Sequence, residues 1–118
     1  KRIIIIDRFT DSTIAYQHFG LGVDLNLIRK IHNVILNDFK IDFTFLNVVN
    51  EKNMLQRLKK RNKLNRYDTF NVKFYKKVQK GFLTLAKKKP NKYKIINSNL
   101  DMKINKDIVL KKISELIK

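Results

Sequence analysis

The chain has 118 residues, of which 43% are hydrophobic, and 27 Lys and Arg against 10 Asp and Glu give it a formal net charge of +17. That is one domain's worth of chain, and too apolar to be a disordered segment with this much charge. The lack of cysteine excludes disulfides and thiolate metal sites. No apolar run approaches the roughly 20 residues of a membrane span and no signal peptide is visible, so we expect a cytoplasmic protein.

The positive charge is compatible with anionic partners. The chain is also rich in Asn and Ile, and an A/T-rich coding sequence produces this joint bias without any selection for binding. We therefore interpret the lysines as solvated surface, and we expect neither a nucleic acid nor a membrane as partner.

Three short apolar stretches predict strands. Ile3–Ile6 is a β-branched run without polar alternation, which is typical of a strand buried on both faces of a parallel sheet. Phe43–Val49 and Tyr93–Ile96 predict the second and third strands. Because helical patterns separate all three, the sequence predicts an α/β fold, a parallel sheet with flanking helices.

Two helices are predicted in the first connection. Asp11 is expected to cap a short helix that runs through Gln17, and Asp24 a longer one. The longer helix has apolar residues at a 3.6-residue period, predicted to be buried: Leu27, Ile28, Ile31, Val34 and Ile35.

Three more helices are predicted further along the chain. Asn50 opens one whose apolar face carries Met54, Leu55 and Leu58. After a charged stretch, a long helix closes before Pro90, and its core positions are Phe70, Phe74, Val78, Phe82 and Leu85. Asn105 is expected to cap a terminal helix that buries Val109, Ile113 and Leu116 or Ile117.

A polar loop follows the first predicted strand. Asp7 and Arg8 stand at its carboxyl end, where open parallel sheets bind their ligands, and helical spacing places Ser12, Ala15 and Tyr16 near one face of the next turn. Arginine binds phosphate through two parallel hydrogen bonds. The pattern therefore indicates either a phosphate site or a structural salt bridge between Asp7 and Arg8.

Residues 7–17, Asp-Arg-Phe-Thr-Asp-Ser-Thr-Ile-Ala-Tyr-Gln, resemble the D-R-(Y/F/H)…S-x-x-A-Y-Q motif of thymidylate kinases. The rest of the chain resembles that family in the same order. Residues 20–22 resemble its G-R-G loop, 42–46 its D-L-T-F-L strand, 55–61 the approach to its lid, 65–68 the lid's D-R-I-E, 74–82 the helix after the lid, and 95–97 its I-D-A.

The resemblance implies phosphoryl transfer from ATP to dTMP, with Mg²⁺ bridging the donor phosphates. It implies that Arg8 holds the dTMP phosphate and the transferred group, and that Asp7 joins the polar network around the phosphates and Mg²⁺. Ser12 and Gln17 would face the thymidine pocket. Tyr16 would pack against the deoxyribose and disfavour a 2′-hydroxyl.

By the same resemblance, residues 59–68 would form the lid over the ATP phosphates. Arg61, Lys63 and Arg66 make the chain look like those members that carry catalytic basic residues in the lid, so Arg61 and Arg66 are assigned catalytic roles beside Asp7 and Arg8. Arg57 or Arg61 would stack on adenine. The alternative is a solvated charge run between two helices. No metal ligand is assigned within the chain.

Several positions depart from the family's pattern. Leu21 replaces the arginine of G-R-G, and His18 and Phe19 replace the glycines before it. Acidic positions are replaced by Val48, Asn50, Asn65 and Asn97. His18 and His32 have no partners at metal or catalytic spacing, so both are interpreted as incidental.

No G-x-x-x-x-G-K-[ST] phosphate-binding motif occurs in the chain. The resemblance implies that the predicted strands are the third, fourth and fifth of a five-stranded sheet whose first strand lies between the third and fourth. We therefore expect a single partial domain over residues 1–118, P-loop NTPase-type and nucleoside monophosphate kinase-like, with its N-terminal strands missing. Either Ile3–Ile6 pairs directly with Phe43–Val49, or a further segment belongs between them.

We accordingly predict that the chain is an incomplete and inactive part of a homodimeric thymidylate kinase. One alternative is another deoxynucleotide kinase, since the substrate loop is altered. The other is a non-catalytic, basic nucleic-acid-binding module on a kinase scaffold, whose binding would weaken steeply with salt.

Overall fold

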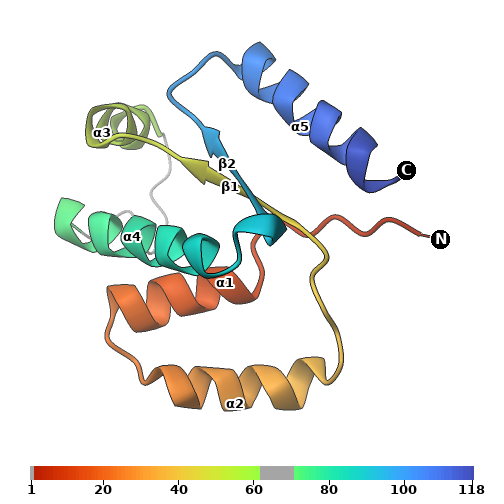
Figure 1. Ribbon diagram of the computed structural model, residues 1–118. Coiled ribbons are helices and arrows are strands. Elements are labelled where there is room, and N and C mark those ends of the chain that lie inside the picture. Colours follow the sequence, from red (N-terminus) through yellow and green to blue (C-terminus); the bar gives the residue numbers. More distant parts are fainter. Residues whose placement is uncertain (1, 62–70) are drawn as a thin grey trace. The chain divides into compact units, whose positions relative to one another are not determined.

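The structure is a computed structural model, and it describes residues 2–61 and 71–118. The elements in chain order are α1 (Thr10–Thr13), the π-helix η1 (Ile14–Gly20), α2 (Leu25–Leu36), β1 (Thr44–Val48), α3 (Glu51–Lys59), α4 (Val72–Lys88), the 3-10 turn η2 (Pro90–Lys92), β2 (Tyr93–Asn97) and α5 (Met102–Leu116) (Figure 1). The chain divides into two compact units. The first holds α1, η1, α2 and α4, and the second holds the remaining elements.

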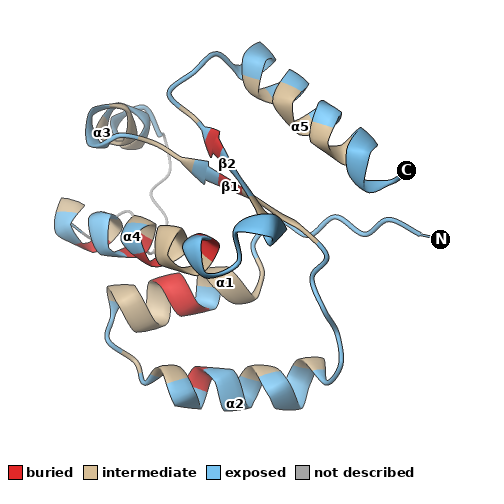
Figure 2. Ribbon diagram, in the orientation of Figure 1, coloured by how far each residue is buried: buried red, intermediate tan, exposed pale blue. Residues whose placement is uncertain are grey.

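In the first unit, α1 and η1 form one continuous helical stretch that lies between α4 and α2 (Figure 1). Its core lies where η1 meets α4, and Figure 2 shows the buried positions on those two elements. Ile14 and Ala15 of η1 are buried there, as are Phe74 and Val78 of α4. The predicted long helix and these two core positions are confirmed, while Phe70 lies outside the described residues.

Two glycines allow η1 and α4 to approach closely. A Cβ atom added at Gly81 would lie 2.7 Å from two ring carbons of Phe19, and one added at Gly20 would lie 2.6 Å from Cε2 of Phe74. Real Cβ contacts are not that short, so any side chain at either position would push the two elements apart.

We predict that Gly81→Ala destabilises the protein although alanine favours helix. The gain in helix propensity is about 1 kcal/mol, whereas overpacking a filled contact typically costs about 1–3 kcal/mol. Denaturant unfolding should therefore show a net loss of stability. Lys80→Ala, at an exposed position of the same helix, is the control. A Gly81→Ala protein more stable than the wild type would contradict this packing.

The second unit contains a parallel pair of strands. β1 and β2 run in register from Thr44 opposite Tyr93 to Val48 opposite Asn97. Leu46 and Ile96 are its buried centre. The second and third predicted strands are thus confirmed, as is their parallel pairing.

Helix α5 contacts the last residue of β2 and the residue that precedes β1. The Nδ2 atom of Asn105 donates to the carbonyl oxygen of Asn97 over 2.9 Å, and the Lys112 ammonium lies 5.4 Å from the ring centroid of Phe43. The helix begins at Met102 because the Asp101 carboxylate accepts from the Lys103 amide over 2.7 Å. The prediction that Asn105 is the cap is therefore wrong. One of Leu116 and Ile117 was predicted to be buried, but both are exposed.

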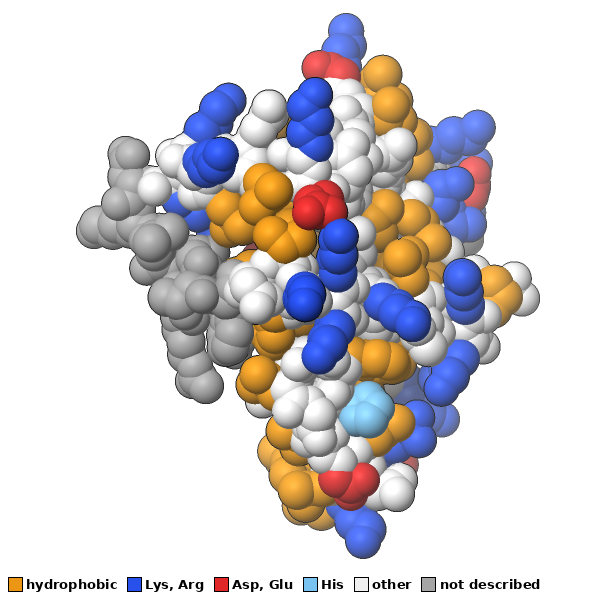
Figure 3. Space-filling model, turned by 90° about the vertical axis from the view of Figure 1, so that its left-hand side faces the viewer, with side chains coloured by type: hydrophobic (Ala, Val, Ile, Leu, Met, Phe, Trp, Pro, Cys, Tyr) orange, Lys and Arg blue, Asp and Glu red, His pale blue; other side chains and the backbone are white. Residues whose placement is uncertain are grey.

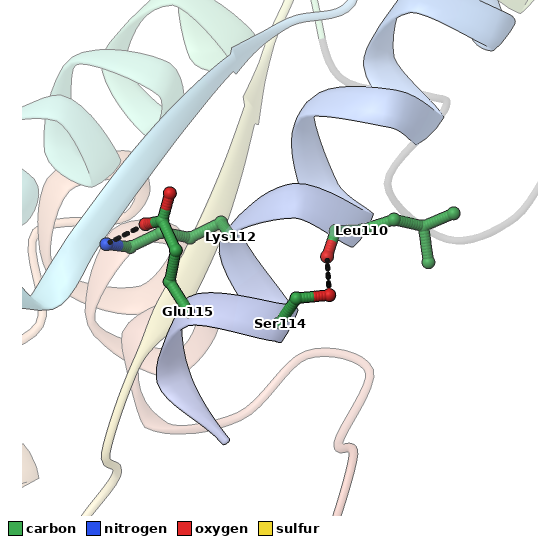
Figure 4. Close-up of polar contacts among 4 residues, drawn as sticks. All are labelled: Leu110, Lys112, Ser114 and Glu115. Atoms are coloured by element: carbon green, nitrogen blue, oxygen red, sulfur yellow. Dashed lines mark hydrogen bonds and ion pairs between the residues drawn. The ribbon is translucent and has the colours of Figure 1, made fainter. Parts of the chain in front are cut away.

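Polar side chains line the last turns of α5 (Figure 4). Nζ of Lys112 lies 3.1 Å from Oε2 of Glu115, and the Ser114 hydroxyl donates to the Leu110 carbonyl over 3.0 Å. The hydrogen bond from Lys112, with its positive charge, lowers the pKa of Glu115 below its ordinary value. This end of the helix is therefore solvated surface.

The prediction of a buried strand at Ile3–Ile6 is wrong for this structure. These residues form no strand, and their exposed fractions lie between 45% and 87%. In the described residues the sheet consists of β1 and β2, so of the two alternatives for Ile3–Ile6, direct pairing with Phe43–Val49 is not found. A strand needs a neighbouring strand to pair its backbone amides and carbonyls, and residues 3–6 have no such neighbour among the described residues.

Two expectations for the helices of the first unit also fail. Thr10 begins α1, so Asp11 lies in the first turn and is not the cap. Asp24 does cap α2, accepting from the Leu27 amide over 3.0 Å. Of the predicted buried face of α2, however, only Ile28 is buried, because within this unit α2 packs chiefly against η1. The exposed members of that face are Leu27, Ile31, Val34 and Ile35.

Candidate functional site

The loop after Ile6 brings Arg8 against Tyr16. The backbone of Arg8 has a φ of 60°, in the left-handed region that few non-glycine residues adopt. Its guanidinium carbon lies 5.6 Å from the centroid of the Tyr16 ring. Asp7 and Arg8 are both exposed, and the described residues contain no ion pair between them. The structural salt bridge that the sequence left open is therefore not present.

Two phenylalanines of α4 pack against the Tyr16 ring. The ring centroid of Phe74 lies 6.0 Å away and that of Phe82 6.4 Å away, both edge to face. Such pairs contribute about 0.5–1.5 kcal/mol beyond the area that they bury. Phe74 was predicted as core, and it is buried. The sequence did not indicate that the same ring also supports a site residue.

Ser12 and Gln17 lie on the same helical stretch as Tyr16, and all three are half-buried. Ala15, predicted on the same face as Ser12 and Tyr16, turns into the core instead, with no exposed surface. Residues 14–20 form a π-helix, a rare geometry that is frequent at functional sites. The structure thus gathers Arg8, Ser12, Tyr16 and Gln17 around one helical segment.

A second group of polar residues lies in the other unit, at the carboxyl ends of β1 and β2. Nη2 of Arg57 donates to the carbonyl oxygen of Ser98 over 2.6 Å. Arg61 follows α3 and is exposed, with its amide donating to the Leu58 carbonyl. Lys63 and Arg66, with most of the predicted lid, lie outside the described residues.

Asn99 ties the start of α3 to the turn after β2. Its Oδ1 accepts from the Asn50 amide over 3.0 Å and from Nδ2 of Asn53 over 2.9 Å. Its Nδ2 donates to Oδ1 of Asn97 over 2.8 Å. Asn50 in turn caps α3 as predicted, accepting from the Asn53 amide over 2.8 Å. Asn99 therefore uses both ends of its amide.

We predict that Asn99→Asp destabilises the protein and that Asn97→Asp does not. The carboxylate at position 99 would lose its donor and face the acceptor oxygen of Asn97, at a cost of about 0.5–1.5 kcal/mol, the typical net contribution of one hydrogen bond. In the contacts above, Asn97 serves Asn99 as an acceptor alone, so an aspartate there keeps its bonds. Denaturant unfolding of both variants tests this, and equal stabilities would contradict the network.

The chemistry open to these groups is anion binding. An exposed guanidinium beside an aromatic ring suits a phosphate attached to a flat or apolar group. Among the described residues no three His, Cys, Asp or Glu side chains gather into a metal site.

Comparison with known proteins also finds proteins that bind a nucleotide phosphate. The family profile described as thymidylate kinase matches residues 1–109. The chain belongs to the thymidylate kinase family.

Individual thymidylate kinases resemble the chain over most of its length. That of Wolbachia pipientis wMel is 45% identical over 95 residues, covering 80% of this chain and 46% of the relative. That of the Wolbachia strain wPip is 39% identical over 117 residues, covering 94% and 55%. A crystal structure of thymidylate kinase from Ehrlichia chaffeensis matches with a TM-score of 0.64 at 28% identity, over 91% of this chain and 49% of that one.

The chain thus spans about half the length of the thymidylate kinases that it matches. The resemblance seen in residues 7–17 is confirmed at the level of the family, and the likeness to a solved structure confirms the α/β, P-loop NTPase-type fold. The roles of single residues stay predictions, and so does the single partial domain. In the described residues no helix is both long and apolar enough to cross a membrane.

Proposed function

We propose that the whole protein transfers the γ-phosphate of ATP to dTMP, giving dTDP for the synthesis of DNA precursors. Family membership supports the reaction. The observation that carries it in this structure is the placement of the exposed Arg8 guanidinium over the Tyr16 ring.

The residues of the first unit would bind the acceptor. Arg8 would hold the dTMP phosphate and the transferred group, because transfer depends mostly on positioning and on neutralising charge. Tyr16, braced by Phe74, would pack against the deoxyribose and leave no room for a 2′-hydroxyl. Ser12 and Gln17 would face the thymidine.

The donor would be bound by residues of the second unit and of the lid, namely Arg57, Arg61, Lys63 and Arg66. Arg57 already holds the turn after β2 through Ser98, so we assign the adenine contact to that turn and its arginine. Mg²⁺ typically binds one or two carboxylates together with substrate phosphates. It would therefore enter with ATP, and Asp7 would join the polar network around the phosphates and Mg²⁺.

These 118 residues contain no glycine-rich motif for the ATP β-phosphate, so we propose that they do not sustain turnover by themselves. We also propose a homodimer, as the family resemblance implies. Assay of the isolated chain beside the whole protein, and sedimentation of the whole protein, measure the two properties.

The alternative functions differ in the acceptor nucleotide that is phosphorylated and in how binding depends on salt concentration. Leu21 in the substrate loop makes another deoxynucleotide kinase the enzymatic alternative. A side-by-side comparison of activity with dTMP, dUMP and dCMP decides it.

The other alternative is a basic nucleic-acid-binding module. On the face shown in Figure 3, Lys and Arg side chains are spread over the surface with few acidic ones between them. Binding through that charge alone would collapse between low and moderate salt, whereas a shaped pocket would keep its preference for thymine.

We predict that Arg8→Ala lowers kcat/KM for dTMP by roughly 10²–10³-fold in the whole protein, because a positioned positive charge on the transferred group is lost. Arg29→Ala is the matched control, since Arg29 is an exposed arginine of α2 in the same unit. Thermal melting should show both variants folded. An Arg8→Ala enzyme with the turnover of the wild type would remove the phosphate-clamp assignment.

A further inference from the structure

His18, interpreted from the sequence as incidental, closes the loop that follows η1. Its Nδ1 lies 2.8 Å from the carbonyl oxygen of Val23. A carbonyl oxygen only accepts, so Nδ1 carries the hydrogen and donates it. The amide of Val23 donates in turn to the carbonyl oxygen of Gln17 over 2.9 Å. Both polar backbone groups of Val23 are thus held by the end of η1.

The returning loop makes two more bonds to the same end of the helix. The Leu21 amide donates to the Tyr16 carbonyl over 3.1 Å, and the Gly22 amide to the His18 carbonyl over 2.9 Å. Gly22 permits the return with a φ of 79°, a left-handed conformation that side chains disfavour. The loop therefore satisfies carbonyl groups that the end of a helix would leave unpaired, those of Tyr16 and Gln17 among them.

Packing fixes the imidazole as well as its hydrogen bond. The ring centroids of His18 and Phe19 lie 4.9 Å apart, edge to face, and Phe19 sits where Gly81 of α4 leaves no Cβ. His18 is half-buried, so its bond to Val23 competes less with water than a surface bond would. The orientation of the imidazole is thus linked to the core of the first unit.

We propose that His18 is a positioning residue for the acceptor side of the site. By holding Val23 against Gln17, it fixes the last turn of η1, and with it the side chains of Tyr16 and Gln17. The inference rests on the proposed function, because those two side chains matter only if they bind dTMP.

Two amide substitutions at position 18 separate this role from simple packing. The Nδ2 atom of an asparagine falls close to the place of the imidazole Nδ1, so His18→Asn can keep the bond to Val23, whereas the longer His18→Gln carries its donor past it. In the whole protein, His18→Gln should raise KM for dTMP about three- to tenfold, the effect of one lost hydrogen bond, and leave KM for ATP unchanged. His18→Asn should stay within about twofold of the wild type on the same basis.

His32→Gln is the matched control, since His32 is the chain's other histidine and lies on α2, away from this loop in the sequence. It should change neither KM. If His18→Gln does not fold, Gly22→Ala opens the same loop through backbone strain and should raise KM for dTMP in the same way.

Several results would count against the proposal. Equal KM values for dTMP in His18→Asn and His18→Gln would overturn it, as would a His18→Gln enzyme identical to the wild type. A wild-type protein that does not phosphorylate dTMP would overturn the proposed function and this inference with it. An active wild type with unaffected variants would overturn the inference alone.

Discussion

The contact between η1 and α4 determines most of what the first unit can do. It exists because Gly20 and Gly81 bring no Cβ atoms to the interface, which lets the rings of Phe74 and Phe19 lie against the opposite backbone. The same contact leaves Tyr16 at the rim of the core, with its ring held by α4 and one face near Arg8. Core and site are therefore not separate features here, since the residues that fill one orient the other.

The second unit achieves its order with neutral amides. Asn50, Asn53, Asn97 and Asn99 join the start of α3 to the end of β2 through hydrogen bonds that bring no charge to the carboxyl ends of the strands. Carboxylates at two neighbouring positions of such a network would repel each other, whereas amides can alternate donor and acceptor. Arg57, further along α3, reaches the same turn by donating to the carbonyl oxygen of Ser98.

The sequence predicts those features that depend on residues within the same segment. Asp24 and Asn50 cap the helices that follow them, and Phe43–Val49 holds a strand because its aromatic and β-branched residues favour one. Ile3–Ile6 and the face of α2 were predicted wrongly because burial depends on a neighbour, which no local pattern supplies. The motif at residues 7–17 identified the family, yet no sequence pattern indicates the hydrogen bond of His18, because its partner is a backbone carbonyl. The left-handed backbone at Arg8 is not indicated either, because arginine has no preference for that conformation.

For the proposed role of Arg8 as phosphate clamp, that backbone conformation has a consequence for how long dTMP stays bound. A non-glycine residue held in the left-handed region costs on the order of 1–3 kcal/mol, and the fold of the first unit holds Arg8 there. In the proposed complex, the dTMP phosphate would meet an Arg8 backbone already in this conformation and would not need to order it. Preorganisation of this kind shows mainly as slower dissociation, because related complexes differ more in how fast they separate than in how fast they form.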